Sequence, residues 1–221
     1  MDPEFWHERW AKNEIGFHEA RPNRLLTAHL PVLGLAPGAR IFLPLCGKTR
    51  DIGWLRAQGY RVAGAELSER AVRQLFADLA LSPTVTAAGK LQRFCADGVE
   101  IFVGDIFDLT AETLGPVDAV YDRAALVALP PEMRRRYAPH LAALAGAAPI
   151  LLLCFVYDQS LMRGPPFAVP AEEVAALYGG RYAVTLLARE EIPGGLRGRP
   201  ARDELWRLSP AGASANPASH P

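Results

Sequence analysis

The sequence predicts a single α/β domain built on a doubly wound, mostly parallel β-sheet. With 221 residues, the chain is the size of one domain that can bury a substantial core. Half of its residues are hydrophobic and 22% are charged, which is typical of a globular protein. From residue 40 onward, short apolar runs alternate with helical patterns, and this alternation indicates right-handed βαβ units.

Seven segments have the apolar or alternating pattern of strands. They are residues 41–45, 60–67, 99–105, 117–123, 149–157, 182–190 and 203–209. The run at 149–157 is the most apolar, as expected for a strand at the centre of a parallel sheet. Residues 82–98 are less regular, and we expect a loop or a hairpin there.

Helices are expected between these strands. Their predicted ranges are residues 22–30, 47–58, 69–79, 130–144 and 171–178. Ser68 is a favourable N-cap, because its hydroxyl can accept a hydrogen bond from a free backbone N–H. The helix after Ser68 carries an inward face of Val72, Leu75, Phe76 and Leu79. The run Arg134–Arg136 is interpreted as the solvated face of its helix.

The charge balance excludes one broad class of function. Lys plus Arg and Asp plus Glu both number 24, so the formal net charge is zero. The chain as a whole therefore has no basic footprint for nucleic acid, and no nucleic-acid partner is expected.

The cysteines and histidines point to a reducing compartment and to no metal. The three cysteines are far apart and show no C-x-x-C spacing, and the five histidines form no ligand cluster. The amino terminus, MDPEFWHERW, has no apolar leader, and the longest apolar run is too short to span a bilayer as a helix. We expect a cytoplasmic protein without a membrane association or a metal ion.

Residues with binding potential follow four successive predicted strands. Ligands of doubly wound sheets bind beyond the carboxyl ends of the strands, near the point where the strand order reverses. Gly47 permits close approach of a ligand to the backbone. Glu66 can accept from ribose hydroxyls, and Asp105 can accept from an exocyclic amine while Ile106 packs on a base. The alternatives are a solvated acid at Glu66, a helix N-cap at Asp105 and a surface ion pair between Asp122 and Arg123.

This set of residues fits a ligand that contains adenosine. The G-x-G-x-x-G motif of dinucleotide-binding proteins is absent, and a phosphate loop would need glycine at Phe42. S-adenosylmethionine has no pyrophosphate, so it does not need three glycines. The pattern therefore favours S-adenosylmethionine over a dinucleotide.

Six sequence blocks resemble the signature blocks of thiopurine S-methyltransferases, especially the bacterial branch. In chain order they are WHERWAKNEIGFH, FLPLCGK, VAGAELSE, GDIFDL, YDRAALVAL and GPPF. The resemblance covers nearly the whole chain, up to about Ser209. It implies the class I methyltransferase fold, which is Rossmann-like and has a late antiparallel strand. It also implies a monomer with S-adenosylmethionine as donor, S-adenosylhomocysteine as product and no metal.

The resemblance also assigns residues to the cofactor. Residues 1–30 form an amino-terminal cover on a domain of residues 1–209, and residues 210–221 are expected to be a disordered tail. The cofactor contacts implied by the family are Trp6, Trp10, Leu45, Gly47, Glu66, Asp105, Ile106 and Arg123. The family often has serine in place of Asp105, so the family supports only the position of that contact.

On the acceptor side, the resemblance implies that Phe17 faces the substrate, that Arg123 reaches it and that Pro165 and Pro166 form a wall of its pocket. A late arginine, Arg197 or Arg199, is the counterpart of one that serves substrate in some members. The implied reaction is attack of a thiol sulfur on the sulfonium methyl group. We nominate no general base, because thiopurine thiols ionise near neutral pH. Relatives also suggest selenium and tellurium acceptors.

Two other classes of function compete with this interpretation. The first is a nicotinamide-dependent oxidoreductase on a similar sheet, which the missing glycine motif disfavours. The second is a non-catalytic protein that binds S-adenosylmethionine, which the retained pocket residues disfavour. Cys46, at a strand end, is interpreted as a packed thiol and not as a nucleophile, because no histidine is near it in the sequence.

Overall fold

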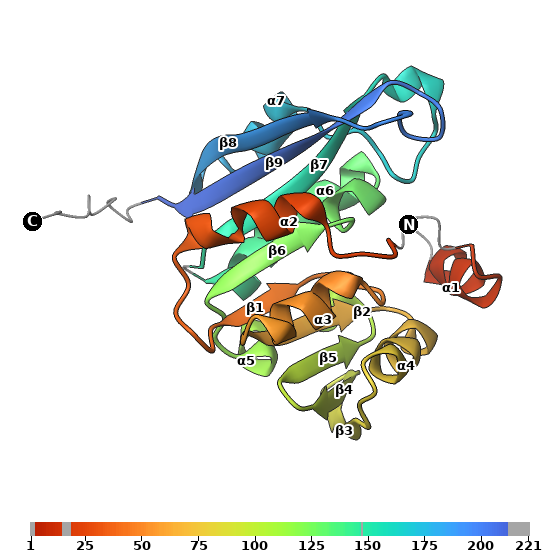
Figure 1. The fold of residues 1–221 in the computed structure, drawn as a ribbon, viewed down its shortest axis with the longest axis vertical. Helices are drawn as coiled ribbons and strands as arrows, with labels where there is room; N and C mark the ends of the chain where they lie inside the picture. Colours follow the sequence, from red (N-terminus) through yellow and green to blue (C-terminus); the bar gives the residue numbers. More distant parts are fainter. Residues whose placement is uncertain (1–2, 15–18, 147, 212–221) are drawn as a thin grey trace, which may run out of the picture.

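The computed structural model describes residues 3–14, 19–146 and 148–211. A central twisted sheet lies between two layers of helices, and α1 (Pro3–Ala11) lies beyond the carboxyl ends of the parallel strands, next to α4 (Glu69–Asp78) (Figure 1). The predicted α/β class is confirmed.

The sheet of the described residues has nine strands in the order β3-β4-β5-β2-β1-β6-β7-β9-β8. Their bounds are β1 Arg40–Leu43, β2 Arg61–Glu66, β3 Thr84–Ala88, β4 Leu91–Ala96, β5 Val99–Val103, β6 Ala119–Arg123, β7 Ile150–Tyr157, β8 Tyr182–Glu191 and β9 Ala201–Pro210. Strands β5, β2, β1, β6 and β7 pair in parallel, and β9 pairs antiparallel with both β7 and β8. All seven predicted strands and the late antiparallel strand are confirmed.

The sheet exceeds the predicted seven strands because residues 84–96 form a hairpin. Strands β3 and β4 pair antiparallel with each other, and β4 adds to the outer edge of β5. The pattern of residues 82–98 did not distinguish this hairpin from a loop, because most side chains of β3 are exposed and give no apolar alternation.

Helices cover both faces of the sheet (Figure 1). One face carries α2 Arg24–His29, α3 Arg50–Ala57 and α4 Glu69–Asp78; the other carries α5 Ala111–Leu114, α6 Pro131–Ala145 and α7 Ala171–Tyr178. Four 3₁₀ turns complete the described elements: Leu30–Leu33, Ile106–Asp108, Leu126–Ala128 and Gln159–Leu161. Among the described residues, no helix is both long enough and apolar enough to cross a membrane.

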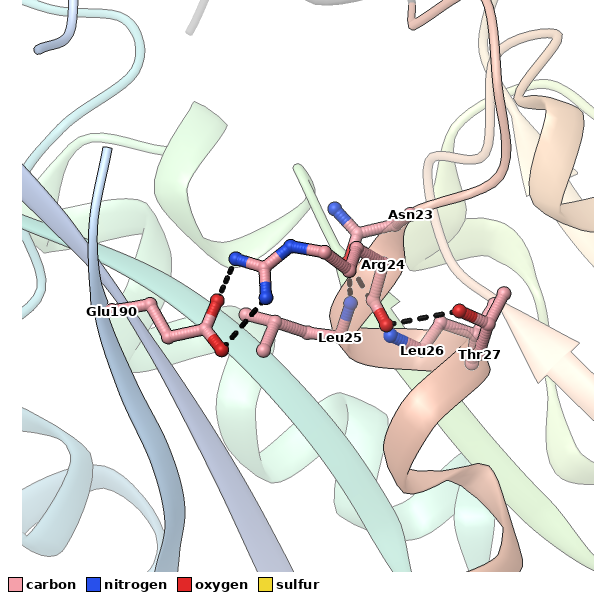
Figure 2. Close-up of polar contacts among 6 residues, drawn as sticks. All are labelled: Asn23, Arg24, Leu25, Leu26, Thr27 and Glu190. Atoms are coloured by element: carbon pink, nitrogen blue, oxygen red, sulfur yellow. Dashed lines mark hydrogen bonds and ion pairs between the residues drawn. The ribbon is translucent and has the colours of Figure 1, made fainter. Parts of the chain in front are cut away.

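Polar side chains fix the starts of three helices. Ser68 caps α4 as predicted, and its hydroxyl accepts from the Ala71 N–H. Asn23 caps α2, accepting from the N–H groups of Leu25 and Leu26 (Figure 2). Thr49 caps α3, so that helix begins at Arg50 and not at Gly47 as predicted. Residues 47–49 are thereby left as a loop at the sheet edge.

The prediction of a solvated arginine run is wrong for Arg134. Its side chain is 2% exposed, and its Nη1 lies 3.0 Å from Glu173 and 3.1 Å from the carbonyl oxygen of Ala168. Arg134 lies one helical turn before the buried residues Tyr137 and Ala138, so it falls on the inward face of α6. Charge alone did not reveal this position, because the partner Glu173 lies far away in the sequence.

The strand order reverses between β1 and β6: β2 is added on one side of β1, and β6 and β7 are added on the other side. The connection from β1 to β2 runs through α3, on one face, whereas the connection from β6 to β7 runs through α6, on the other face. These two strands are neighbours in the sheet, so their carboxyl ends form the switch point at which such folds bind ligands.

Candidate active site

A cavity of about 680 Å³ lies at the carboxyl edge of the parallel strands. Ten of the predicted site residues line it: Trp6, Trp10, Leu45, Gly47, Glu66, Asp105, Ile106, Arg123, Pro165 and Pro166. Phe17, predicted to face the substrate, lies outside the described residues. The structure therefore brings together residues from the amino-terminal helix, four strand ends and the GPPF loop.

Two residues in the cavity wall have left-handed backbone conformations without being glycine. Leu45 has φ 45° just after β1, and Ala124 has φ 61° just after β6. Such conformations cost free energy for residues with a Cβ and concentrate at functional sites. The two strained positions follow the neighbouring strands β1 and β6, so they flank the switch point.

Glu66 joins the loops that follow β1 and β2. Its side chain is buried, its Oε2 accepts from the Gly47 N–H at 2.8 Å and its Oε1 accepts from the Ser68 N–H at 2.8 Å. Burial raises the pKa of this carboxyl, and the hydrogen bonds from Ser68, Gly47 and Leu67 oppose the shift. The alternative of a solvated strand-end acid is excluded, because Glu66 is held inside the wall of the cavity.

The aromatic amino-terminal helix packs against the loop after β1. Gly47 has φ 53°, and a Cβ at that position would lie 3.1 Å from the ring of Trp10, which is 4% exposed. Trp6, Phe5 and Arg9 of the same helix also line the cavity. Helix α1 thus closes one side of the cavity from beyond the strand ends (Figure 1).

Asp105 fulfils the capping role that the sequence left open. Its Oδ1 accepts from the Phe107 N–H at 3.0 Å and so caps the short turn Ile106–Asp108. The Asp105 side chain is exposed in the cavity wall, and Ile106 beside it is 5% exposed. Capping fixes the orientation of the carboxylate and is compatible with a second acceptor role toward a ligand amine.

Arg123 is the centre of a charged cluster formed with Glu19, Asp51 and Asp203, and Tyr121 lies among them. Its side chain is 9% exposed and forms an ion pair with Glu19, and Asp51 is buried nearby. Burial on its own lowers the pKa of Arg123, but attraction by Glu19, Asp51 and Tyr121 outweighs burial and raises it. Arg123 therefore remains a cation in a largely desolvated setting, where it interacts strongly with anionic groups.

Asp122 faces away from the cavity, so a surface pair between Asp122 and Arg123 is excluded. Consecutive strand residues point to opposite faces of a sheet. Asp122 is fully buried, where it accepts from the Tyr137 hydroxyl at 2.7 Å and from the Leu126 N–H at 3.1 Å. These bonds fix the turn that carries Arg123 and Ala124.

The burial of Asp122 predicts a pH dependence of stability. Burial raises the pKa of Asp122 from 3.8 to about 6, against the hydrogen bonds from Tyr137 and the backbone. Because the folded-state pKa is the higher one, the folded protein loses stability as the pH rises between these two values, by about 3 kcal/mol. Asp122→Asn cannot ionise, so chemical denaturation should show its free energy of unfolding gaining about 3 kcal/mol on the native chain between about pH 4 and pH 7. A difference that stays constant with pH would contradict the shifted pKa.

The GPPF loop forms the far wall of the cavity and is held by three contacts. The Tyr157 hydroxyl donates to the Pro166 carbonyl at 2.7 Å, and Arg197 Nη2 donates to the Pro165 carbonyl at 3.1 Å. The Phe167 N–H donates to the Val127 carbonyl at 2.6 Å. The sequence left open whether Arg197 or Arg199 serves the substrate. Arg197 lies in the cavity wall, whereas Arg199 does not line the cavity.

Several residues in the cavity wall escaped the sequence interpretation. Glu19, Phe155 and Asp203 all line the cavity. Asp203 lies near the start of β9, where the strand pattern gave no functional signal; its position follows from the antiparallel pairing of β9 with β7. Among the described residues, no three His, Cys, Asp or Glu side chains gather as a metal-binding group.

Cys46 is a packed thiol in the cavity wall. It is 7% exposed, and its Sγ would lie 2.8 Å from a Cβ added at Gly64. Burial raises the pKa of the Cys46 thiol well above its usual value, and the negative charge of Glu66 adds to the shift. The thiolate needed for nucleophilic attack is therefore disfavoured. We expect Cys46→Ser to retain kcat for methyl transfer within about threefold, and a complete loss of activity in a folded variant would contradict this interpretation.

Comparisons with known proteins identify the relatives of this chain. The family profile described as thiopurine S-methyltransferase matches residues 1–199. A thiopurine S-methyltransferase of Xanthobacter autotrophicus is 58% identical over 213 residues, which cover 96% of this chain and 100% of that relative. A second one, from Gluconobacter oxydans, is 50% identical over 93% of this chain and 94% of its own length.

Solved structures show the same fold at low sequence identity. A magnesium protoporphyrin IX methyltransferase from Synechocystis, solved with bound SAH, has a TM-score of 0.65 and 15% identity over 94% of this chain and 100% of that one. A 1,6-didemethyltoxoflavin-N1-methyltransferase from Burkholderia thailandensis has a TM-score of 0.65 and 16% identity over 94% of this chain and 87% of that one. From its fold, its switch-point cavity and these relatives, the chain belongs to the thiopurine S-methyltransferase family.

Proposed function

We propose that this chain transfers a methyl group from S-adenosylmethionine to the sulfur of thiopurine-like or aromatic thiols, and that its acceptors extend to selenium and tellurium compounds. One observation carries the proposal: a single cavity joins Glu66, at the end of β2, to Arg123, at the end of β6. The names of the relatives support the acceptor class.

The described residues fit the donor. A volume of about 680 Å³ lies within the range of small-molecule sites, about 300–1,000 Å³. Glu66 would accept from the ribose hydroxyls, Asp105 and Ile106 would hold the adenine, and Gly47 would let the backbone approach closely. Trp6 and Trp10 would cover the cofactor, with Leu45 beside its methionine part.

The acceptor would lie on the side of β6, β7 and β9. Pro165 and Pro166 wall that side, and Arg197 joins them through its bond to Pro165. Phe17, which the family places against the substrate, belongs to this proposal as well. We call the part of the cavity lined by Pro165, Pro166 and Arg197 the acceptor half. Arg123 would serve both ligands, because it lies between this half and the part lined by Glu66.

Bound S-adenosylmethionine supplies an electrophilic sulfonium methyl group. The chain contributes positioning and exclusion of water, which together account for a large part of such rate enhancements. Arg123 favours the ionised form of a thiol acceptor, because it is a largely desolvated cation beside the acceptor half of the cavity.

The three cysteines are unpaired, which supports our proposal of a cytoplasmic enzyme. We also propose a monomer with small-molecule partners alone; light scattering tests its mass.

The experiment compares acceptors and cofactors in parallel. Methyl transfer to 6-mercaptopurine, thiophenol, selenite and tellurite would be measured with S-adenosylmethionine, and melting temperature would be followed with S-adenosylhomocysteine and with NADH. We expect S-adenosylhomocysteine alone to raise the melting temperature, and the thiols to be methylated. Stabilisation by NADH would favour an oxidoreductase, and binding without methylation of any acceptor would favour a non-catalytic binding protein.

A further inference from the structure

Asp203 lies in the acceptor half of the cavity without any role in the proposed function above. In the sheet it pairs with Phe155 near the carboxyl end of β7 and with Glu190 on β8. Both Asp203 and Phe155 line the cavity. The antiparallel course of β9 thus brings a carboxylate to the same edge as the carboxyl ends of the parallel strands.

One oxygen of this carboxylate has an unmet hydrogen-bonding capacity. Within the described residues, Asp203 Oδ1 is buried and has no hydrogen-bond partner. Leaving a buried polar atom unpaired costs about 1–3 kcal/mol, so such atoms in native proteins call for an explanation. A ligand that carries a proton and enters the cavity would satisfy this oxygen.

Burial raises the pKa of Asp203, and the charges around it modify that shift. Glu19, before α2, adds negative potential, while Arg123 on β6 and Arg24 on α2 add positive potential. Burial, which is the largest cause, and Glu19 raise the pKa of Asp203, whereas the two arginines lower it, and the net result is a pKa of about 6.

The remaining charged neighbours are engaged elsewhere. Glu190 forms a two-point ion pair with Arg24, as Figure 2 shows. On β9, the strand that carries Asp203, Arg202 forms an ion pair with Glu204. Tyr121 on β6 interacts electrostatically with Asp203, and burial raises the pKa of Tyr121 well above its usual value, so it stays neutral.

We propose that Asp203 accepts the proton of acceptors that are still protonated at neutral pH, and so extends the enzyme to thiols that do not ionise by themselves. The inference rests on the proposed function. The S–H bond breaks and its proton passes to Asp203 Oδ1. The new bond from sulfur to the methyl carbon forms as the carbon–sulfonium bond breaks, and the electron pair of that bond stays on the sulfur of S-adenosylhomocysteine. Asp203 then releases the proton to water.

Two thiols of different acidity separate this role from a structural one. 4-Nitrothiophenol is ionised at neutral pH, whereas benzyl mercaptan is protonated. We expect Asp203→Asn to lower kcat/KM for benzyl mercaptan about 100-fold, as is typical when a general base is lost. Activity with 4-nitrothiophenol should stay constant or rise, because a negative charge near the anionic acceptor has been removed. The matched control is Glu190→Gln, which neutralises the neighbouring acid on β8 and should leave both rates unchanged.

Binding provides a readout that does not depend on turnover. In the complex with S-adenosylhomocysteine, calorimetry should show that Asp203→Asn weakens benzyl mercaptan and strengthens 4-nitrothiophenol. An equal loss of rate or affinity for both thiols would overturn the inference while leaving the proposed function intact. Failure of the native enzyme to methylate either thiol would instead contradict the proposed function.

If Asp203→Asn does not fold, the pH dependence of the native enzyme provides an independent test. With benzyl mercaptan, kcat/KM should rise with pH and level off above about 6, because Asp203 must be ionised to accept the proton. A rise that continues without a plateau to about pH 8 would mean that only the free thiolate reacts, and would overturn the inference.

Discussion

Replacing Arg123 with alanine is expected to lower the free energy of unfolding by about 3–5 kcal/mol at neutral pH and to abolish measurable methyl transfer. Arg123 is the cation that faces Glu19, Asp51 and Asp203, and Asp51 is only 1% exposed. Without the guanidinium, a buried carboxylate loses its compensating charge, and the acceptor half of the cavity becomes negative. Urea denaturation and an assay with an ionised thiol measure the two effects separately.

Arg123→Lys is the matched control for charge. It keeps the cation but not the planar, multi-donor group, so we expect it to recover most of the stability and only part of the activity. The stability loss of the alanine variant should also shrink as the pH falls toward 4, because burial raises the pKa of Asp51 and of Asp203, so that these two carboxyl groups become neutral. A loss that is independent of pH would contradict the electrostatic explanation.

Replacing Glu66 with glutamine is expected to weaken S-adenosylhomocysteine binding at least 100-fold. The two carboxylate oxygens accept from the Gly47 and Ser68 N–H groups, whereas an amide offers only one oxygen. One buried N–H then loses its partner, which costs about 1–3 kcal/mol, and the ribose loses its anionic acceptor. Calorimetric titration with S-adenosylhomocysteine measures the change in Kd.

Glu69→Gln provides the comparison for the Glu66 variant. Glu69 lies in the first turn of the adjacent helix α4, where it forms an exposed i,i+4 pair with Arg73. Exposed pairs contribute little, so binding should change less than twofold. Equal binding by the Glu66 and Glu69 variants would mean that Glu66 only supports the loops and does not contact the ligand.

The strand ends could be predicted from the sequence because parallel strands share one carboxyl edge. This rule alone placed Gly47, Glu66, Asp105 and Arg123 together, and the structure has all four in one cavity wall. The resemblance added the cover residues Trp6 and Trp10, which lie outside the βαβ pattern, and they too line the cavity.

What could not be predicted depends on contacts between distant parts of the chain. Asp203 reaches the cavity only because β9 pairs antiparallel with β7, and Glu19 only because its segment lies over β6. Arg134 looked solvated within a charged run, yet it pairs with Glu173 on another helix. In each case the partner lies far away in the sequence, and a local pattern carries no information about it.

The left-handed backbone conformations in the cavity wall could not be predicted from the sequence either. Leu45 and Ala124 have left-handed φ values, although neither residue type favours them. Residues close to them in the sequence are held by tertiary hydrogen bonds: the Gly47 N–H donates to Glu66, and the Tyr137 hydroxyl donates to Asp122. The helix after β1 was predicted to begin at Gly47, whereas α3 begins at Arg50.

Transfer of an isotopically labelled methyl group is the most direct test of the central claim, that this cavity methylates thiol sulfur. The purified chain would be incubated with methyl-deuterated S-adenosylmethionine and 6-mercaptopurine, and the products analysed by mass spectrometry. The account predicts a thioether that carries the label on sulfur, formed together with S-adenosylhomocysteine. Label on a nitrogen or oxygen of the acceptor, or no labelled product from an enzyme that binds S-adenosylhomocysteine, would contradict it.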